Sequence, residues 1–340
     1  TLASGERVLN LLEESPETED ITGQEHTRFD NITCKDLHFS YEDEQILSGY
    51  SISVPKGSRV GIHGKSGSGK STLLKLLMRF YDADQGSIRI GSREIDSINT
   101  TELRDMESYV TQETSLFHDS IANNIAIAKP DASQSEIEAA ARKASLHEFI
   151  QSLPDGYDTM IGELGDTLSG GEKQRIGIAR ALAVNPEFLL CDEPISALDV
   201  SVQAQIVNLL VRLQKERGLT SMFIAHDLSM VKHISDRIGV MYLGNLVELA
   251  NSEELYQRPL HPYTEALLSA IPLPNPRSER ERKRIRLKGE VPSPIDPPQG
   301  CHFCNRCRYA EEICHKNVPE FQEVEEGHFV ACHRYQKELC

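Results

Sequence analysis

The sequence has 340 residues, a length that predicts one main domain with an appendage. Its formal net charge of −16 argues against general affinity for nucleic acid, whose phosphates attract positive surfaces. No apolar run reaches the eighteen or so residues of a membrane span, and residues 1–20 lack the pattern of a signal peptide. These features predict a cytoplasmic protein without a nucleic-acid partner.

Along the chain, residues 1–28 are expected to form a helix and an acidic linker. From about residue 29 to 250, short apolar runs alternate with helical patterns, which is typical of a layered α/β fold. Three of these runs have the composition of strands buried on both faces: 59–64, 187–193 and 220–227. Helical patterns dominate from about 115 to 180 and indicate an inserted helical subdomain. Prolines cluster after residue 258, so 251–340 is interpreted as a C-terminal extension with linkers.

GKSGSGKS, residues 64–71, lies between an expected strand and an expected helix and matches the phosphate-loop pattern. Its glycines let backbone N–H groups face a phosphate, and the helix N-terminus adds a positive dipole end. Lys70 can reach the β- and γ-phosphates, and the Ser71 hydroxyl can coordinate Mg²⁺. The pattern predicts a nucleoside triphosphate site. Its expected contacts are Gly64, Lys65, Ser66, Gly67, Ser68, Gly69, Lys70, Ser71 and Thr72.

Two further segments add to this site. EFLLCDE ends an expected strand with Asp192, a candidate Mg²⁺ ligand, and Glu193, a candidate general base beside the γ-phosphate. LSGGEKQR opens a helix with Ser169, Gly170 and Gly171 at its N-terminus, which can form a second anion-binding surface. Two such helix N-termini predict a nucleotide held from both sides, and one of the helices can come from a second subunit.

These segments, with SALD at 196–199 and a strand-ending His226, occur in the order found in the ATP-binding domains of ABC transporters, which residues 30–250 resemble. The resemblance implies a P-loop NTPase fold, with a RecA-like α/β core, an antiparallel β subdomain and an inserted helical subdomain. It also implies hydrolysis of Mg·ATP by two ATPase subunits that close head to tail. In such a pair, Ser169 and Gly171 serve the ATP bound to the partner subunit's Lys70.

The resemblance assigns roles to four more side chains. It implies that Tyr41 stacks on adenine, and that Gln112 contacts Mg²⁺ and relays the nucleotide state to a membrane subunit. Asp199 corresponds to the D-loop aspartate, and His226 to the histidine that holds the γ-phosphate and the attacking water. Taken alone, Tyr41 could be a core aromatic, and Gln112 and His226 could be polar residues with structural partners.

The two halves of the chain resemble different branches of this family. Residues 1 to about 170 are similar to an exporter ATPase, as in VTQETSLFHDSIANNIA. Residues from about 170 to 340 are similar to the ATPase of oligopeptide and dipeptide importers, as in CDEPISALDVSVQAQIVNLL and RPLHPYTEALLSAIP. The change falls within the shared segment LSGGEKQRIGIARAL. This pattern is that of a chimera, either a natural recombinant or an engineered one.

The resulting hypothesis is the ATPase subunit of a peptide importer, peripheral on the cytoplasmic face of the membrane and coupled to a separate permease. The first alternative is the ATPase half of an exporter. The second is a soluble ABC-type ATPase of translation or repair. Translation types carry two cassettes, but this chain has one phosphate loop, and it lacks the long coiled coil of the repair types.

CHFCNRC, residues 301–307, has two-residue gaps that suggest a ferredoxin site, but the fourth cysteine of that pattern is absent, because residue 311 is Glu. The importer resemblance instead selects Cys301, Cys307, Cys314 and Cys332, which in some members hold a [4Fe–4S] cluster. Four thiolates also suit Zn²⁺, so the metal stays open between iron and zinc. A small lobe with reduced, metal-free cysteines is the main alternative, and the expected cytoplasmic compartment disfavours a disulfide knot.

Overall fold

The computed structural model describes residues 26–336, except 43, 163–167, 197, 226, 273–283, 291 and 294–296. The helix expected near the N-terminus and the expected catalytic His226 therefore lie outside the described residues. Within the described part, no helix is both long and apolar enough to cross a membrane. The domain boundaries expected at residues 28 and 250 stay predictions.

The largest element is an eight-stranded sheet in the order β11-β12-β10-β9-β3-β8-β7-β6. Its strands from β9 to β6 run parallel, and β10, β12 and β11 continue it antiparallel. The parallel strands are β3 (Arg59–His63), β6 (Glu107–Val110), β7 (Phe188–Asp192), β8 (Thr220–Ile224) and β9 (Arg237–Tyr242). The antiparallel strands are β10 (Asn245–Asn251), β11 (Gln322–Glu325) and β12 (His328–Val330).

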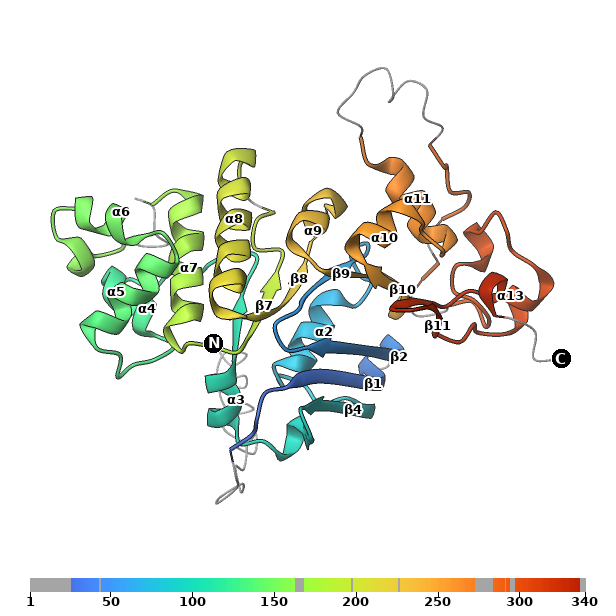
Figure 1. The fold of residues 1–340 in the computed structure, drawn as a ribbon, viewed down its shortest axis with the longest axis horizontal. Coiled ribbons are helices and arrows are strands. Elements are labelled where there is room, and N and C mark those ends of the chain that lie inside the picture. Colours follow the sequence, from blue (N-terminus) through green and yellow to red (C-terminus); the bar gives the residue numbers. More distant parts are fainter. Residues whose placement is uncertain are drawn as a thin grey trace, which may run out of the picture.

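A second, antiparallel sheet has the order β2-β1-β4-β5 and lies on one side of the large sheet (Figure 1). Its strands are β1 (Asn31–Tyr41), β2 (Glu44–Pro55), β4 (Gln85–Ile90) and β5 (Arg93–Glu94). Helix α2 (Lys70–Leu77) buries leucines in the same apolar cluster as this sheet. The expected P-loop NTPase core with an antiparallel β subdomain is confirmed.

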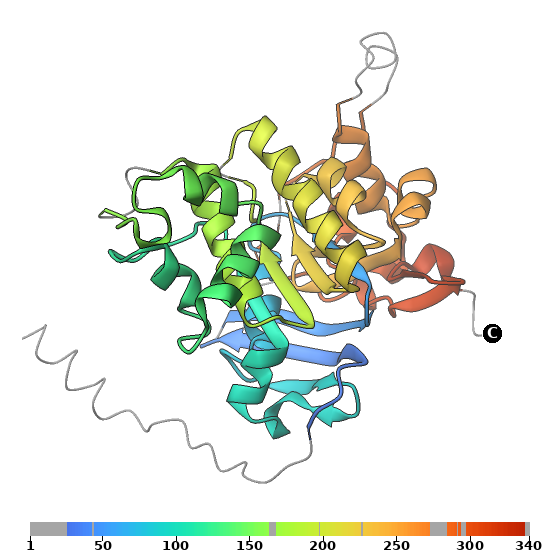
Figure 2. The same cartoon turned by 60° about the vertical axis from the view of Figure 1, so that its left-hand side comes forward.

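Most of the remaining helices gather on the opposite side of the large sheet and at its ends (Figures 1 and 2). The remaining helices are α3 (Thr100–Met106), α4 (Ile121–Ala126), α5 (Gln134–Lys143), α6 (His147–Ser152), α7 (Gly170–Ala183), α8 (Val200–Arg217), α9 (Leu228–Ile234), α10 (Ser252–Gln257), α11 (Pro262–Ala270) and α13 (Glu312–Lys316). Of these, α3 instead buries Leu103 and Met106 in the apolar cluster of the antiparallel sheet. The helical pattern at 137–150 forms two helices, because Ser145 has a left-handed backbone with φ of 53° that ends α5 before α6 begins.

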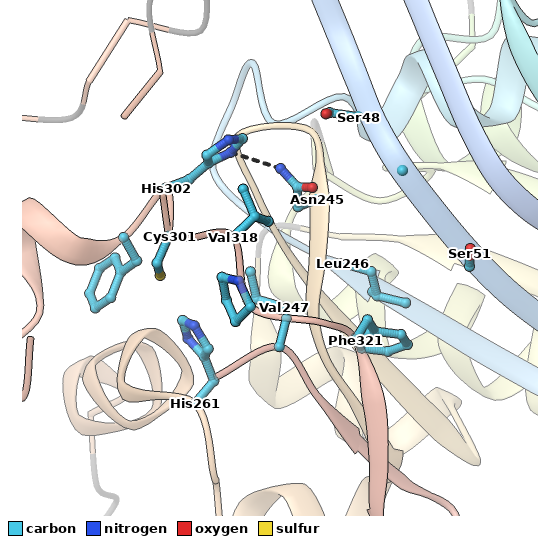
Figure 3. A pocket seen from close by; sticks show the side chains of 14 residues that line it. Ser48, Ser51, Asn245, Leu246, Val247, His261, Cys301, His302, Val318 and Phe321 are labelled. Carbon is cyan, nitrogen blue, oxygen red and sulfur yellow. Dashed lines mark hydrogen bonds between the residues drawn. The ribbon is translucent and has the colours of Figure 1, made fainter. Parts of the chain in front are cut away.

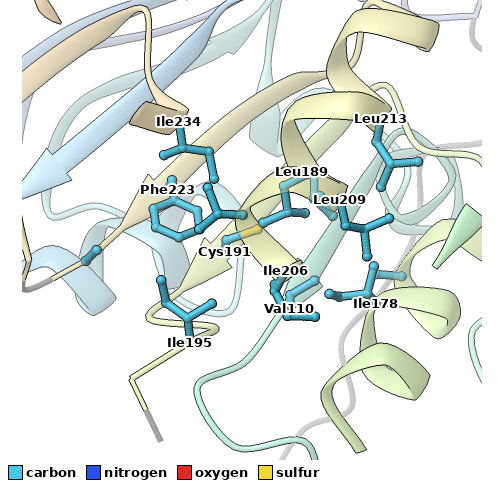
Figure 4. Close-up of a cluster of buried hydrophobic side chains, with 14 of the residues drawn as sticks. Val110, Ile178, Leu189, Cys191, Ile195, Ile206, Leu209, Leu213, Phe223 and Ile234 are labelled. Atoms are coloured by element: carbon cyan, nitrogen blue, oxygen red, sulfur yellow. The ribbon is translucent and has the colours of Figure 1, made fainter. Parts of the chain in front are cut away.

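Alternation along the strands builds an apolar cluster on each face of the large sheet. In β7, Leu189 and Cys191 face the cluster beneath α8, while Phe188 and Leu190 face the antiparallel sheet. Figure 4 shows Cys191 between Phe223 and side chains of α8. Both faces of β7 are therefore covered, which explains why its sequence is a continuous apolar run.

The C-terminal lobe, residues 297–336, continues the main sheet. Its strand β12 pairs with β10, with Glu248 opposite Val330. The junction holds a fully buried carboxylate, Glu248, which accepts hydrogen bonds from the backbone N–H of Leu260 (2.7 Å) and from His328 Nε2 (2.8 Å). The lobe thus docks through backbone pairing and a buried ion pair.

Candidate functional site

The phosphate loop leaves the carboxyl end of β3 and enters α2, as expected from the sequence. Gly67 and Gly69 have φ of 77° and 92°, a left-handed conformation that glycine adopts without strain. Lys70 is 5% exposed, and its Nζ donates to the carbonyl oxygens of Gly64 (2.8 Å) and Lys65 (3.0 Å). Burial lowers the pKa of Lys70, against the opposing charges of Glu193 and Asp192. The ammonium group is therefore held at the loop, ready to exchange carbonyl partners for phosphate oxygens.

Asp192, at the end of β7, stands beside the first turn of α2. Its Oδ1 accepts a hydrogen bond from the Ser71 hydroxyl at 3.2 Å. Its Oδ2 accepts one from the hydroxyl of Tyr109, on the neighbouring strand β6, at 3.0 Å. A carboxylate and a hydroxyl at the end of a phosphate loop are the oxygen ligands that Mg²⁺ takes in nucleotide sites. These side chains fit a bound Mg²⁺.

Tyr109 is a site residue that the sequence did not reveal. Burial and the nearby Asp192 carboxylate raise its pKa well above the usual range, so the phenol remains a hydrogen-bond donor. Tyr109 pairs in register with Leu190, two residues before Asp192 and on the same face of the sheet. Only the knowledge that β6 and β7 are neighbours could have identified it.

Glu193 is 8% exposed and has φ of 47°, a left-handed conformation that is unusual for a glutamate. The strained backbone is held by three hydrogen bonds: Glu193 N–H donates to Ile224 O (3.0 Å), and both the N–H and the hydroxyl of Ser196 donate to Glu193 O (3.1 Å each). Backbone strain of this kind concentrates at functional sites. The turn directs the glutamate into a cavity.

This phosphate cavity, of about 400 Å³, collects several of the expected site residues. Lys70, Ser71, Gln112 and Glu193 all line it. Its other lining residues are Glu44, Ile46, Ser66, Gly67, Gly69 and Thr72. A carboxylate, an ammonium group, a hydroxyl and a side-chain amide thus converge on one open cavity, a set of groups suited to bind a phosphate and Mg²⁺.

Ser169, Gly170 and Gly171, which we call the signature, lie away from the phosphate cavity. Ser169 caps the N-terminus of α7, accepting from Glu172 N–H (3.3 Å), while the Glu172 carboxylate accepts from Ser169 N–H (2.7 Å). Gly170 lines a second cavity of about 340 Å³, which Gln112 also lines. Among the described residues, the lining of the phosphate cavity includes none of Ser169, Gly170 and Gly171.

Two other expected residues have structural partners. Asp199 caps α8, accepting hydrogen bonds from the N–H groups of Ser201 and Val202 at 3.0 Å. The ring of Tyr41 packs edge-on against Phe39 and Tyr81, with centroids 4.9 and 5.3 Å away. Among the described residues that line the phosphate cavity, Tyr41 is absent. Their proposed roles in adenine stacking and in the D-loop stay predictions.

The four cysteines expected to bind metal lie in the C-terminal lobe as free thiols. Burial raises the pKa of Cys301 to about 12 and that of Cys332 to about 11, and the neighbouring thiol of Cys314 contributes to both shifts. In the described part of the chain, no group of three or more His, Cys, Asp or Glu side chains is arranged to hold a metal ion. The expected [4Fe–4S] or Zn²⁺ site, which also includes Cys307 and Cys314, therefore lacks support in this arrangement.

Comparison with known proteins identifies two family matches. The family "ABC transporter" matches residues 47–196, and "Oligopeptide/dipeptide transporter, C-terminal region" matches residues 247–314. The putative oligopeptide transport ATP-binding protein YkfD of Bacillus subtilis is 47% identical over 301 residues, covering 85% of this chain and 89% of YkfD. AppF of the same organism, an oligopeptide transport ATP-binding protein, is 44% identical over 86% of this chain and 90% of AppF.

A solved structure of a bacterial Atm1-family ABC exporter with ATP bound is similar as well. It is 39% identical, with a TM-score of 0.67, over 76% of this chain. The chain spans 45% of the exporter chain's length. The chimera expected from the sequence stays a prediction, because peptide-transport relatives and the exporter each align with most of the chain.

Proposed function

The chain belongs to the ATP-binding proteins of the ABC transporter family and is an ATPase, and from this premise we propose that it powers the uptake of oligopeptides through a separate permease. The substrate class rests on the printed names of the relatives and on the family matched by residues 247–314. The observation that carries the mechanism is the convergence of Lys70, Ser71, Gln112 and Glu193 on one cavity, with Asp192 bonded to Ser71.

In the proposed reaction, the N–H groups of the phosphate loop and the ammonium group of Lys70 bind the phosphates of ATP. Ser71, Asp192 and Gln112 would hold Mg²⁺, which supplies positive charge to the phosphate oxygens when bound. The Glu193 carboxylate accepts a proton from the attacking water. Tyr109 keeps the Asp192 carboxylate oriented. His226 would hold the γ-phosphate, as the family resemblance implies.

We propose that two ATPase subunits close head to tail around two ATP molecules. Ser169 and Gly170 lie outside the phosphate cavity of their own chain, so a signature that contacts ATP must face the cavity of a partner. The N-terminus of α7 offers unpaired N–H groups and a positive dipole end to that phosphate. The partner is a second copy or a closely related ATPase.

The permease is proposed to contact the groove beside Gln112. Residues 112–116 line this groove together with Lys173 and Gln174 of α7. Phe117, directly after it, is 59% exposed and offers an apolar surface beside the groove. Because Gln112 lines both this groove and the phosphate cavity, it can transmit the nucleotide state to the permease. Docking there places the subunit on the cytoplasmic face of the membrane.

The ATPase half of an exporter is the second candidate, favoured by the 39% identity to the Atm1-family structure. Copurification distinguishes the two functions: an importer ATPase should bring down separate permease subunits of a peptide-uptake system, identified by mass. Recovery of an exporter membrane domain instead would reverse the assignment. For Cys301, Cys307, Cys314 and Cys332, metal binding stays a prediction.

The catalytic proposal is tested with Glu193→Gln. This variant keeps the size of the side chain but removes its basicity, so it should bind Mg·ATP and lose turnover by about two to four orders of magnitude. Glu216→Gln, on the exposed surface near the end of α8, is the matched control for a general loss of one negative charge. Near-normal hydrolysis by the Glu193→Gln variant would rule out the assignment of Glu193.

A further inference from the structure

The turn between β9 and β10 has a strained backbone and is held firmly in place. Both of its residues have a positive φ, 43° at Leu243 and 76° at Gly244. Such a φ is common in glycine but unusual in leucine, and it costs free energy that the surroundings must offset. A Cβ on Gly244 would lie 2.2 Å from Ile46 O, and Gly244 O accepts a hydrogen bond from Ser48 N–H at 3.4 Å. The turn is therefore fixed against β2.

This turn anchors one peptide of the phosphate loop. Gly244 N–H donates to Ser68 O at 3.2 Å. Ser68 lies between Gly67 and Gly69, and glycine restricts the neighbouring peptide planes least of all residues, so a partner outside the loop helps to fix them. In a trans peptide the C=O and the N–H point in opposite directions, so the bond that holds Ser68 O also orients Gly69 N–H. Gly69 lines the phosphate cavity, where its N–H can face a phosphate.

The other end of the same turn peptide is held by the side chain of Asn245, the first residue of β10. Asn245 Nδ2 donates a hydrogen bond to Leu243 O at 3.0 Å. This oxygen belongs to the peptide whose N–H is that of Gly244. The peptide plane is thus fixed at both ends, by the side-chain amide at its oxygen and by Ser68 O at its nitrogen. Only this one peptide separates the Asn245 amide from the phosphate loop.

His302, in the CHFCNRC segment, orients this amide. Asn245 Nδ2 lies 2.7 Å from His302 Nδ1, as Figure 3 shows. The nitrogen of a side-chain amide only donates, so His302 Nδ1 accepts and the ring carries its proton on Nε2. His302 Nδ1 also lies 3.3 Å from Leu243 O, and the amide supplies one hydrogen to each of these two acceptors. Both hydrogens of the Asn245 amide are therefore used, which fixes its orientation.

We propose that Asn245 is a positioning residue of the ATP site. It holds the peptide of the strained turn that fixes Ser68 O, and the Gly69 N–H is thereby directed at the phosphate before ATP binds. His302 is a second positioning residue, because it orients the Asn245 amide. This inference rests on the proposed function, since it assumes that the phosphate loop binds ATP. It gives the CHFCNRC segment a contribution to the nucleotide site that needs no metal.

The test measures equilibrium binding of Mg·ATP and steady-state ATP hydrolysis in the full chain. Asn245→Ala should raise the dissociation constant and KM about two- to tenfold, the range of one lost hydrogen bond. Its kcat at saturating ATP should stay the same, because a loop N–H holds the phosphate equally before and during the reaction. His302→Phe removes Nδ1 and should weaken binding in the same direction, whereas His302→Asn places an oxygen at that position and should restore it. The two losses should be non-additive in the Asn245→Ala, His302→Phe double variant.

Asn251→Ala is the matched control. Asn251 ends the same strand and caps α10, accepting a hydrogen bond from Glu253 N–H at 3.1 Å. Loss of this cap should lower the melting temperature but leave the affinity for Mg·ATP unchanged, which separates a loss of stability from a loss of positioning. The inference is overturned if Asn245→Ala binds Mg·ATP as the unchanged chain does, or if Asn251→Ala weakens binding equally. Failure of the unchanged chain to bind Mg·ATP would instead refute the proposed function.

Discussion

The hydrogen bond from Tyr109 to Asp192 gives the sharpest quantitative prediction. Asp192 accepts from the two hydroxyls of Ser71 and Tyr109, and Tyr109→Phe removes the second while keeping the ring in place. A hydrogen bond to a charged group contributes about 1.5–3 kcal/mol. Because Tyr109 and Asp192 are only partly buried, we take the lower end of this range for their hydrogen bond. A loss of about 1.4 kcal/mol corresponds to about a tenfold change in an equilibrium or rate constant.

The assay is the rate of ATP hydrolysis at saturating ATP as a function of Mg²⁺ concentration. The Tyr109→Phe variant should need about ten times more Mg²⁺ for half-maximal activity, or lose about tenfold in turnover. Tyr157→Phe is the control, because its hydroxyl makes a similar 2.8 Å contact with His147 in a remote helical region. An unchanged Mg²⁺ dependence and turnover in Tyr109→Phe would refute the role of this tyrosine.

Three further predictions concern stability. Leu209→Ala should reduce the free energy of unfolding by about 2–5 kcal/mol in chemical denaturation, because the buried side chain of Leu209 fills the core between α8 and the sheet (Figure 4). A reduction below about 1 kcal/mol would contradict this packing. Gly86→Ala should lower the melting temperature, because its Cβ would lie 2.3 Å from Asp36 O and its φ is 90°; a melting temperature equal to that of the unchanged chain would speak against this geometry. Burial alone would lower the pKa of His328, but hydrogen bonds and charge from Glu248 and Glu254 raise the pKa overall. The protonated His328 therefore stabilises the fold fully below about pH 6.5, and this stabilisation is lost as the pH rises through the raised pKa. The difference in denaturation midpoint between the unchanged chain and His328→Gln should therefore shrink above about pH 6.5, and a difference that grows there would show the opposite sign.

The phosphate loop and its flanking elements were predictable from sequence because their signals are local. The apolar runs at 59–64, 187–193 and 220–227 contain β3, β7 and β8, and the loop residues follow the first of them directly. The glycines of the loop and the fully apolar strand before it leave few alternative structures for this segment. The same reasoning placed Lys70 at the start of the helix after the first run and Glu193 at the end of the second run.

The contacts missed by sequence reasoning join segments that are distant in the chain. Tyr109 meets Asp192 only because β6 and β7 are neighbours, and β12 extends the main sheet only because it reaches β10. A single sequence shows hydrophobic periods but does not show which strands pair. The cysteines of CHFCNRC drew attention to metal, while Phe303 of this segment packs against Tyr242 and Tyr263 of the core.

The central claim is that one ATP is held by the phosphate loop of one subunit and the signature of its partner. The most direct test is the molecular mass in solution of the Glu193→Gln chain, with and without Mg·ATP. We expect Mg·ATP to double the mass, and the added Ser169→Arg to abolish this dimer while each chain still binds ATP through Lys70. A Glu193→Gln chain that binds Mg·ATP and stays monomeric, or a Ser169→Arg chain that still dimerises, would contradict it.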